Sequence, residues 1–213
     1  HHTRLNQVAN LIKFEFNDEQ AYILEFTHQK LRFHKDEAII VEADVTITGI
    51  TQADPGVVTA TGHGYEDGDE VFINDVVGMT EVNGKSYLVA NKAANTFELT
   101  DVDGDDIDTS GFTAYGSGGV AQRIYEIDSP FCNCPYRSVF DIQVTQNADT
   151  MYLVHPFVEP RKLTRTGHTA WTLETYTRTD DPFLDKKVIS SITQADPGVV
   201  TANAHGYSDG DTV

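Results

Sequence analysis

The residues best suited to ion chemistry lie in an acidic run, DVDGDDID, at residues 101–108. Carboxylate oxygens are the ligands that calcium prefers, so the run is a candidate calcium loop. Its five carboxylates belong to Asp101, Asp103, Asp105, Asp106 and Asp108. An EF-hand loop needs glycine at its sixth position and glutamate at its twelfth, whereas Gly104 is fourth and Phe112 is twelfth. We therefore favour a solvated hairpin tip turned by Asp-Gly, and we assign no metal site.

The histidines are the next candidates for catalysis or ligation. His63 and His205 occupy matching positions in GHGY and AHGY, which invites a ligand hypothesis. We favour the alternative in which each histidine packs on, or hydrogen-bonds to, the turn that follows it. His155 and His168 have no serine or aspartate nearby in a recognisable nucleophile motif. The sequence therefore assigns no catalytic residue and no cofactor site.

The chain has two cysteines, Cys132 and Cys134, separated by one residue. A disulfide across so short a spacing is strained and rare, and a metal site would need further ligands at suitable spacing. We therefore expect reduced thiols, which favours synthesis in a reducing compartment.

A basic cluster, Arg161, Lys162 and Arg165, lies close to Trp171 and could contact nucleic acid. We favour a solvated face or ion-pair partners, because the chain carries 33 acidic residues against 15 lysines and arginines, a net charge of −18. Such a charge repels phosphates. If DNA meets this protein, we expect it only as passing cargo.

Period-two alternation of apolar and polar residues predicts the elements that position these side chains. It runs through residues 12–16, 22–26 and 31–33, with polar turns between, and returns in residues 138–156 and 160–176. This pattern is typical of half-buried antiparallel strands. Between these regions, short Val- and Thr-rich segments separated by Gly, Asp and Asn predict a small barrel or sandwich.

An eleven-residue phrase, ITQADPGVVTA, occurs at residues 50–60 and again at residues 192–202. The likeness extends over residues 50–71 and 192–213, with four differences. Four glycines recur at its turns, where they permit backbone angles closed to other residues. They are Gly64, Gly68, Gly206 and Gly210. The phrase therefore marks a duplicated structural module.

We predict an all-β fold in which an antiparallel host sheet or sandwich is interrupted by a small β-barrel insertion. The host comprises residues 1–46 and 122–188, and the module residues 47–121. Residues 189–213 are the truncated start of a second module, so we expect the chain to be a fragment. We expect this tail to be poorly ordered, or to pair with an exposed sheet edge of a neighbouring molecule. No apolar run approaches about 18 residues, so we expect no membrane span.

Residues 9–40 and 122–176 contain FEFNDEQAYILEFTHQKLRFHKD, YEIDSPF and VTQNADTMYLVHPFVEPRKLTRTGHTAWTL. These segments resemble tail structural proteins of tailed bacteriophages and prophages, similar to the tail-tube nozzle proteins of short-tailed phages. The resemblance implies a virion tail component that assembles with copies of itself and with other tail proteins. It also implies synthesis in the bacterial cytoplasm.

The inserted module, from ITQADPG to TFELTD, resembles the first catalytic-cysteine half-domain (FCCH) of ubiquitin-activating enzymes. Ubiquitin activation requires a nucleotide-binding fold and a nucleophilic cysteine, yet residues 48–121 contain no cysteine. The chain also has no Gly-rich phosphate loop between a strand and a helix. The resemblance therefore implies a barrel shape and no reaction.

Two functions are compatible with these observations. The first is a non-enzymatic virion structural protein, a nozzle-like tail component decorated by barrel modules. The alternative is a module that binds carbohydrate or protein on the host-cell surface. Its candidate stacking platforms are Tyr65, Tyr87, Tyr115 and Trp171.

Overall fold

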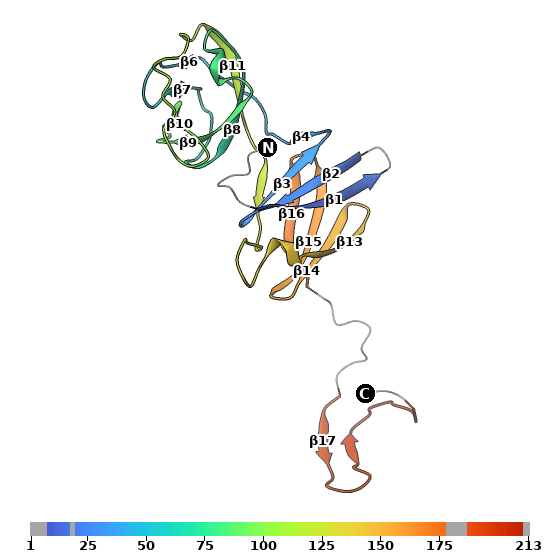
Figure 1. Ribbon diagram of the computed structural model, residues 1–213. Coiled ribbons are helices and arrows are strands. Elements are labelled where there is room, and N and C mark those ends of the chain that lie inside the picture. Colours follow the sequence, from blue (N-terminus) through green and yellow to red (C-terminus); the bar gives the residue numbers. More distant parts are fainter. Residues whose placement is uncertain (1–7, 18–19, 178–186, 211–213) are drawn as a thin grey trace. The chain divides into compact units, whose positions relative to one another are not determined.

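A computed structural model describes residues 8–17, 20–177 and 187–210 (Figure 1). The chain divides into two compact units, His1–Tyr176 and Thr177–Val213. The described elements are antiparallel strands and two short 3-10 turns, which confirms the predicted all-β class. No helix within the described ranges has the length and apolarity that a membrane crossing requires.

Two antiparallel sheets of the first unit lie outside the inserted module. The first has the order β1-β2-β3-β12, with β4 paired to β3. Its strands are β1 (Asn10–Asn17), β2 (Gln20–Phe26), β3 (Lys30–Lys35), β4 (Ala38–Ile39) and β12 (Glu126–Asp128). The second, β13-β14-β15-β16, follows a 3-10 turn, η3 (Val139–Asp141). Its strands are β13 (Gln143–Asn147), β14 (Thr150–His155), β15 (Val158–Gly167) and β16 (Ala170–Thr175).

These two sheets pack on one another and form a host sandwich with one shared core. Alternation places most of the large apolar side chains of these strands on the inner face, as the period-two pattern predicts, while Leu11, Ile23 and Val154 face outward. Trp171 from β16 contacts the other sheet, with its ring 4.8 Å from that of Phe14 and 4.4 Å from that of Phe33. The core comprises Phe14, Tyr22, Leu24, Phe26, Leu31, Phe33, Phe131, Val139, Ile142, Met151, Leu153, Leu163 and Trp171.

Between β4 and β12 the chain forms a seven-stranded antiparallel sheet in the order β5-β11-β8-β9-β10-β7-β6. Its strands are β5 (Val45–Thr46), β6 (Gly49–Ile50), β7 (Val57–Thr59), β8 (Glu70–Val77), β9 (Lys85–Ala90), β10 (Thr96–Thr100) and β11 (Ser117–Arg123). A 3-10 turn, η2 (Thr80–Val82), joins β8 to β9.

The two ends of this sheet are β5 and β6, which are only two residues apart in the chain. Ile47 N–H donates to Gly119 O at 2.9 Å, and Thr48 N–H donates to Thr59 O at 2.8 Å. The sheet therefore curls into a barrel-like module, visible in Figure 1 as the part of the ribbon that carries the labels β6 to β11. Its buried core includes Val58, Tyr65, Tyr87, Phe97 and Leu99.

The second unit contains one hairpin, β17 (Ile189–Ile192) with β18 (Val200–Ala202). Ile192 pairs with Val200 and Ser191 with Thr201, which is the register of Ile50 with Val58 and Gly49 with Thr59. The second copy of the repeat thus reproduces the first hairpin of the module. Whether this tail pairs with a neighbouring molecule stays a prediction, and residues 211–213 lie outside the described residues.

The expectation of reduced cysteines is wrong, because Cys132 and Cys134 are joined by a disulfide. The chain forms a closed loop here: Cys132 N–H donates to Arg137 O, Arg137 N–H donates to Cys134 O, and Cys132 forms a parallel bridge with Ser138. The Cα atoms of the two cysteines are 5.3 Å apart in this loop, within the usual range for a disulfide. Sequence spacing alone did not reveal this loop.

Candidate functional site

The chain enters and leaves the module along paired segments. Val41 and Ile124 form an antiparallel bridge. On either side of it, Glu42 N–H donates to Arg123 O at 2.8 Å, and Tyr125 N–H donates to Ile40 O at 2.9 Å. The module is therefore an insertion whose two ends lie side by side, so the host strands continue across it with little disturbance.

A buried arginine joins the host sandwich to the module at this point. Arg32, on β3, is only 3% exposed. Its Nη2 donates to Glu70 Oε2 of β8 at 2.8 Å, and its Nε donates to Glu126 Oε2 of β12 at 3.0 Å. Burial alone would lower the pKa of Arg32, but the charges of Glu70 and Glu126 outweigh burial and raise it. Removing one partner of such a buried pair typically costs about 3–5 kcal/mol.

A second arginine, Arg123, binds one carboxylate just before the module and one within it. The Arg123 guanidinium donates to Glu42 Oε2 at 2.7 and 3.0 Å, and to Asp69 Oδ2 at 3.0 Å. The hydrogen bond to Glu42 is the main cause of the raised pKa of Arg123, and the bond to Asp69 adds to it against the effect of burial. Arg32 and Arg123 thus bind carboxylates from both ends of the module.

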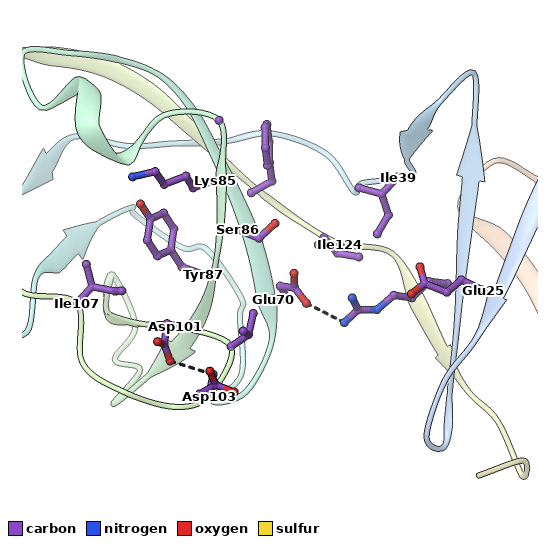
Figure 2. Close-up of a pocket in the computed structure, with 14 residues that line it drawn as sticks. Glu25, Ile39, Glu70, Lys85, Ser86, Tyr87, Asp101, Asp103, Ile107 and Ile124 are labelled. Atoms are coloured by element: carbon purple, nitrogen blue, oxygen red, sulfur yellow. Dashed lines mark hydrogen bonds and ion pairs between the residues drawn. The ribbon is translucent and has the colours of Figure 1, made fainter. Parts of the chain in front are cut away.

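An open cavity of about 840 Å³ lies beside the Arg32–Glu70 pair. Figure 2 shows its polar wall, where Asp101 and Asp103 of the module lie on one side and Glu25 of β2 on the other. Four carboxylates line it, against the cations Arg32 and Lys85. Because Arg32 is already paired with Glu70 and Glu126, the wall is acidic overall and suits a cationic group better than an anion.

The acidic loop at 101–108 uses its first and last aspartates to stabilise turns. Asp101 Oδ1 accepts hydrogen bonds from the N–H groups of Asp103 and Asp105, both at 2.9 Å. Asp108 Oδ1 accepts from Ser110 N–H, and hydrogen bonds from the side chain and the backbone of Ser110 lower the pKa of Asp108. Among the described residues, no group of three or more His, Cys, Asp or Glu side chains is arranged to hold a metal ion.

The histidines make local structural contacts. His63 Nε2 donates to Ala93 O at 2.8 Å, and its Nδ1 accepts from Tyr65 N–H at 3.0 Å, so the predicted turn contact is confirmed. His205 Nδ1 accepts from Tyr207 N–H in the same way. His155 contacts the backbone of Ser138 and Phe157. His168 Nδ1 lies 2.8 Å from the hydroxyl of Tyr22.

All four turn glycines have positive φ angles, between 66° and 97°. Residues other than glycine rarely adopt φ angles in this range. The glycines are Gly64, Gly68, Gly206 and Gly210. Gly68 N–H also donates to Val89 O at 2.8 Å, which ties the turn of the first copy to β9.

The candidate stacking platforms are misassigned. Tyr65, Tyr87 and Trp171 are buried, and their rings belong to the two cores. Tyr115 is partly buried, and its hydroxyl donates to Ile47 O and Gly118 O. Tyr87 in β9 and Trp171 in β16 fall on inner positions of the alternating pattern, whereas Tyr65 and Tyr115 lie in loops that fold against the module core.

The basic cluster does not form one surface. Lys162 is bound to Glu174 at 3.2 Å, on the next strand. Arg165 lies over the rings of Phe16 and Tyr22, 4.6 and 4.9 Å from their centroids. Because Lys162 and Arg165 are three positions apart on β15, strand alternation sends them to opposite faces.

Exposed aromatic side chains were missed by the sequence analysis. Tyr136 is 71% and Phe157 64% exposed, and their rings lie edge to face at 5.9 Å. Phe140 is also exposed. Tyr136 follows the disulfide turn and Phe157 follows β14, so an aromatic residue beside a turn was the available signal. We call Tyr136 and Phe157 the aromatic patch.

Comparison with known proteins identifies a likeness for the module. Residues 53–124 match the family model described as "Ubiquitin-activating enzyme E1 FCCH domain". The chain is 34% identical over 82 residues to the ubiquitin-like modifier-activating enzyme 1 of Oryctolagus cuniculus, and 33% identical to that of Homo sapiens. Each match covers 37% of this chain and 7% of the relative's length. The module is therefore FCCH-like, and the phage-tail resemblance of the host segments stays a prediction.

Proposed function

We propose that this chain is a non-enzymatic structural protein of a tailed-phage or prophage virion. In this proposal it is a nozzle-like tail component that assembles with copies of itself and with other tail proteins. The host sandwich forms part of the tail wall, and FCCH-like modules decorate it. The resemblance of residues 9–40 and 122–176 to nozzle proteins supports this role.

The observation that carries the proposal is the way the module is inserted. Its two connections pair with one another at Val41 and Ile124, and Arg32 binds carboxylates on both sides of the junction. A domain attached by adjacent ends and a buried ion pair is held in a defined orientation on its host. Such an attachment suits a decoration on an assembled wall, where no substrate has to enter or leave.

The oligomeric state of the full chain tests the proposal. Size-exclusion chromatography with light scattering, combined with electron microscopy, should give a mass several times that of one chain and ring-shaped particles. A monomer at every concentration up to about 100 µM would contradict a ring-forming tail protein.

DNA binding tests the passage of DNA through such a ring. The net charge of −18 and the separation of Lys162 from Arg165 favour weak contact with phosphates. A filter-binding assay at physiological salt should give no sub-micromolar affinity. Tight binding would overturn the assignment of DNA as passing cargo.

A second candidate function, contact with a host-cell surface, is favoured by the aromatic patch. Exposed aromatic rings are frequent in sites for proteins and carbohydrates. We expect a Tyr136→Ser/Phe157→Ser double variant to lose binding to cells or to a glycan array. Tyr176→Ser, at an exposed aromatic residue outside the patch, is the control and should bind normally. Equal binding by all three proteins would remove this candidate.

A further inference from the structure

The cavity beside the Arg32–Glu70 pair is lined by residues of the host sandwich and of the module. Figure 2 shows Glu25 and Ile39 of the host on one side, and Ile107 and the acidic loop of the module on the other. We call it the junction cavity. Its volume of about 840 Å³ is large enough to hold a small molecule or a long side chain.

Two buried carboxylates line the junction cavity, and each has one oxygen without a donor. Glu25 is 4% exposed and Glu70 is 6% exposed. Glu25 Oε2 lies 2.6 Å from His34 Nε2, and Glu70 Oε2 accepts from Arg32 Nη2 at 2.8 Å. Within the described residues, no side chain or backbone group donates to the Oε1 atom of either glutamate. Because a buried carboxylate oxygen without a donor is costly, both atoms favour a ligand that donates hydrogen bonds.

Two aspartates of the acidic loop add negative charge to the lining. Asp101 is partly buried and stabilises the loop, whereas Asp103 is exposed at the rim of the cavity. The two cations of the lining do not cancel this charge. Arg32 is already paired with two glutamates, and the side chain of Lys85 is exposed to solvent. The junction cavity therefore attracts cations and repels anions.

Apolar side chains from the connections, from β8 and from the loop after β10 form much of the remaining lining. They are Ile39, Phe72, Val102, Ile107 and Ile124. Phe72 lies between the core residues Val71 and Ile73 on β8, so alternation directs its ring away from the module core. A small hydrated ion would leave this apolar wall uncovered. A cation on an aliphatic stem, as in lysine, arginine or an alkyl amine, matches both the wall and the carboxylates.

We propose that the junction cavity binds a primary ammonium or guanidinium group carried on an aliphatic stem. The stem packs against the apolar wall, and the charged group donates to the carboxylate oxygens that the protein leaves without a donor. Because Glu25 belongs to the host while Glu70 and Asp103 belong to the module, the bound ligand contacts both parts and stabilises their junction. The binding site does not depend on the proposed role in a virion tail.

Two probes, pentane-1,5-diamine and the peptide acetyl-Gly-Gly-Lys-Gly-Gly-amide, are titrated into the isotopically labelled full chain. We expect saturable shifts of the amide resonances of Glu70, Asp101 and Asp103, with a Kd of about 1 mM or tighter. Binding should weaken at least about threefold in 0.5 M salt, because salt screens the attraction. The uncharged pentane-1,5-diol should not bind. Tighter binding of the diamine would identify a free amine as the ligand, and tighter binding of the peptide a side chain of a partner polypeptide.

Three variants locate the binding site within the acidic surface. Glu25→Gln keeps the shape of a buried carboxylate and removes its charge, so it should weaken binding at least about tenfold. Asp103→Asn should weaken binding about threefold, and because Asp103 is exposed this variant should fold normally. Asp106→Asn is the matched control. It removes the same charge from an exposed position of the same loop outside the cavity lining, and it should bind as the unaltered chain does.

Four outcomes would overturn the proposal. The first is the absence of resonance shifts at about 20 mM of either probe, and the second is equal binding of the diol. The third is equal weakening by Asp103→Asn and Asp106→Asn, which would show only a general attraction to an acidic surface. The fourth is unchanged binding in Glu25→Gln. None of these results bears on ring assembly, because the particle mass tests that separately.

Discussion

The two copies of the repeated phrase share a local structure and differ in burial. Both hairpins have the same register, and in both the threonine at the turn accepts a hydrogen bond from a valine N–H at 2.8–2.9 Å. Yet Ile50 is 7% exposed while Ile192 is 64% exposed, and Val58 is fully buried while Val200 is 54% exposed.

The cause of this difference lies outside the phrase. In the first copy, residues 93–121 supply β10, the Thr109 hydroxyl and the Ala121 carbonyl that accepts from Tyr65 Oη at 2.8 Å. In the described residues of unit 2, the hairpin pairs only with itself. A short sequence can therefore determine its own turns while distant segments determine whether its apolar side chains form a core.

The largest expected effect comes from the same charged substitution in each copy. Val58→Asp places an unpaired charge in the module core, and we expect a loss of at least about 3 kcal/mol in the free energy of unfolding. Val200→Asp should change it by less than about 0.5 kcal/mol. Urea denaturation of both variants measures this, and equal losses would show that both copies are buried in solution.

Alkaline pH should weaken the first copy through its buried tyrosines. Burial raises the pKa of Tyr65 and of Tyr87 to about 12, against about 10 in the unfolded chain. Between pH 10 and 12 the unfolded chain binds fewer protons, so stability is complete below pH 10 and falls as pH rises. The slope is at most about 1.4 kcal/mol per pH unit for each tyrosine.

Urea denaturation at pH 8 to 11.5 measures this slope. Tyr65→Phe should reduce the slope, because it removes one of the two hydroxyls whose pKa burial raises to about 12. Tyr207→Phe, at a loop position in the second copy, is the control and should leave the slope unchanged. A flat profile above pH 10 in the unaltered chain would contradict the burial of both hydroxyls.

Alanine should destabilise the module at Gly56 and have no effect at the matched Gly198. A Cβ on Gly56 would lie 2.5 Å from Thr109 Cγ2, which is too close, whereas a Cβ on Gly198 would meet nothing nearer than 3.6 Å. We expect Gly56→Ala to destabilise the module by about 2 kcal/mol and Gly198→Ala to be neutral. Thermal unfolding of both variants tests this, and a stable Gly56→Ala variant would place Thr109 elsewhere.

The smallest effect is expected where the copies already differ in sequence. Gly62 has a φ of 64°, and its counterpart Ala204 has a φ of 50°. A Cβ on Gly62 would meet nothing within 4 Å, so Gly62→Ala should cost only the strain of a left-handed alanine, about 1 kcal/mol. A loss in thermal stability as large as that of Gly56→Ala would show that the first copy does not tolerate the left-handed alanine that the second copy has at Ala204.

Much of the fold could be predicted because alternation and turn residues act over short distances. The apolar positions of residues 12–33 form the inner face of the host sheet, as their period of two indicates. Trp171 failed as a stacking candidate for the same reason. Trp171 is large and aromatic, but its position in the alternating pattern directs it into the core.

The junction could not be predicted, because its partners are distant in sequence. Arg32 and Glu70 are 38 residues apart, and Arg32 and Glu126 are 94 apart. In an alternating strand, a charged residue predicts only that its position faces the solvent. Nothing in the pattern shows that an inserted domain covers that position and provides carboxylates.

By itself, the amino-acid sequence determined the duplication, the hairpins and the turns, since the hydrogen bonds of a hairpin or a turn join residues close together in the chain. His63 with Tyr65 and His205 with Tyr207 make the same contact, whatever surrounds them. Only the tertiary structure showed that residues 93–121 bury the first copy, because a core needs surfaces brought together from distant segments. It also decided that Arg32 would be buried, since two carboxylates had to meet it there.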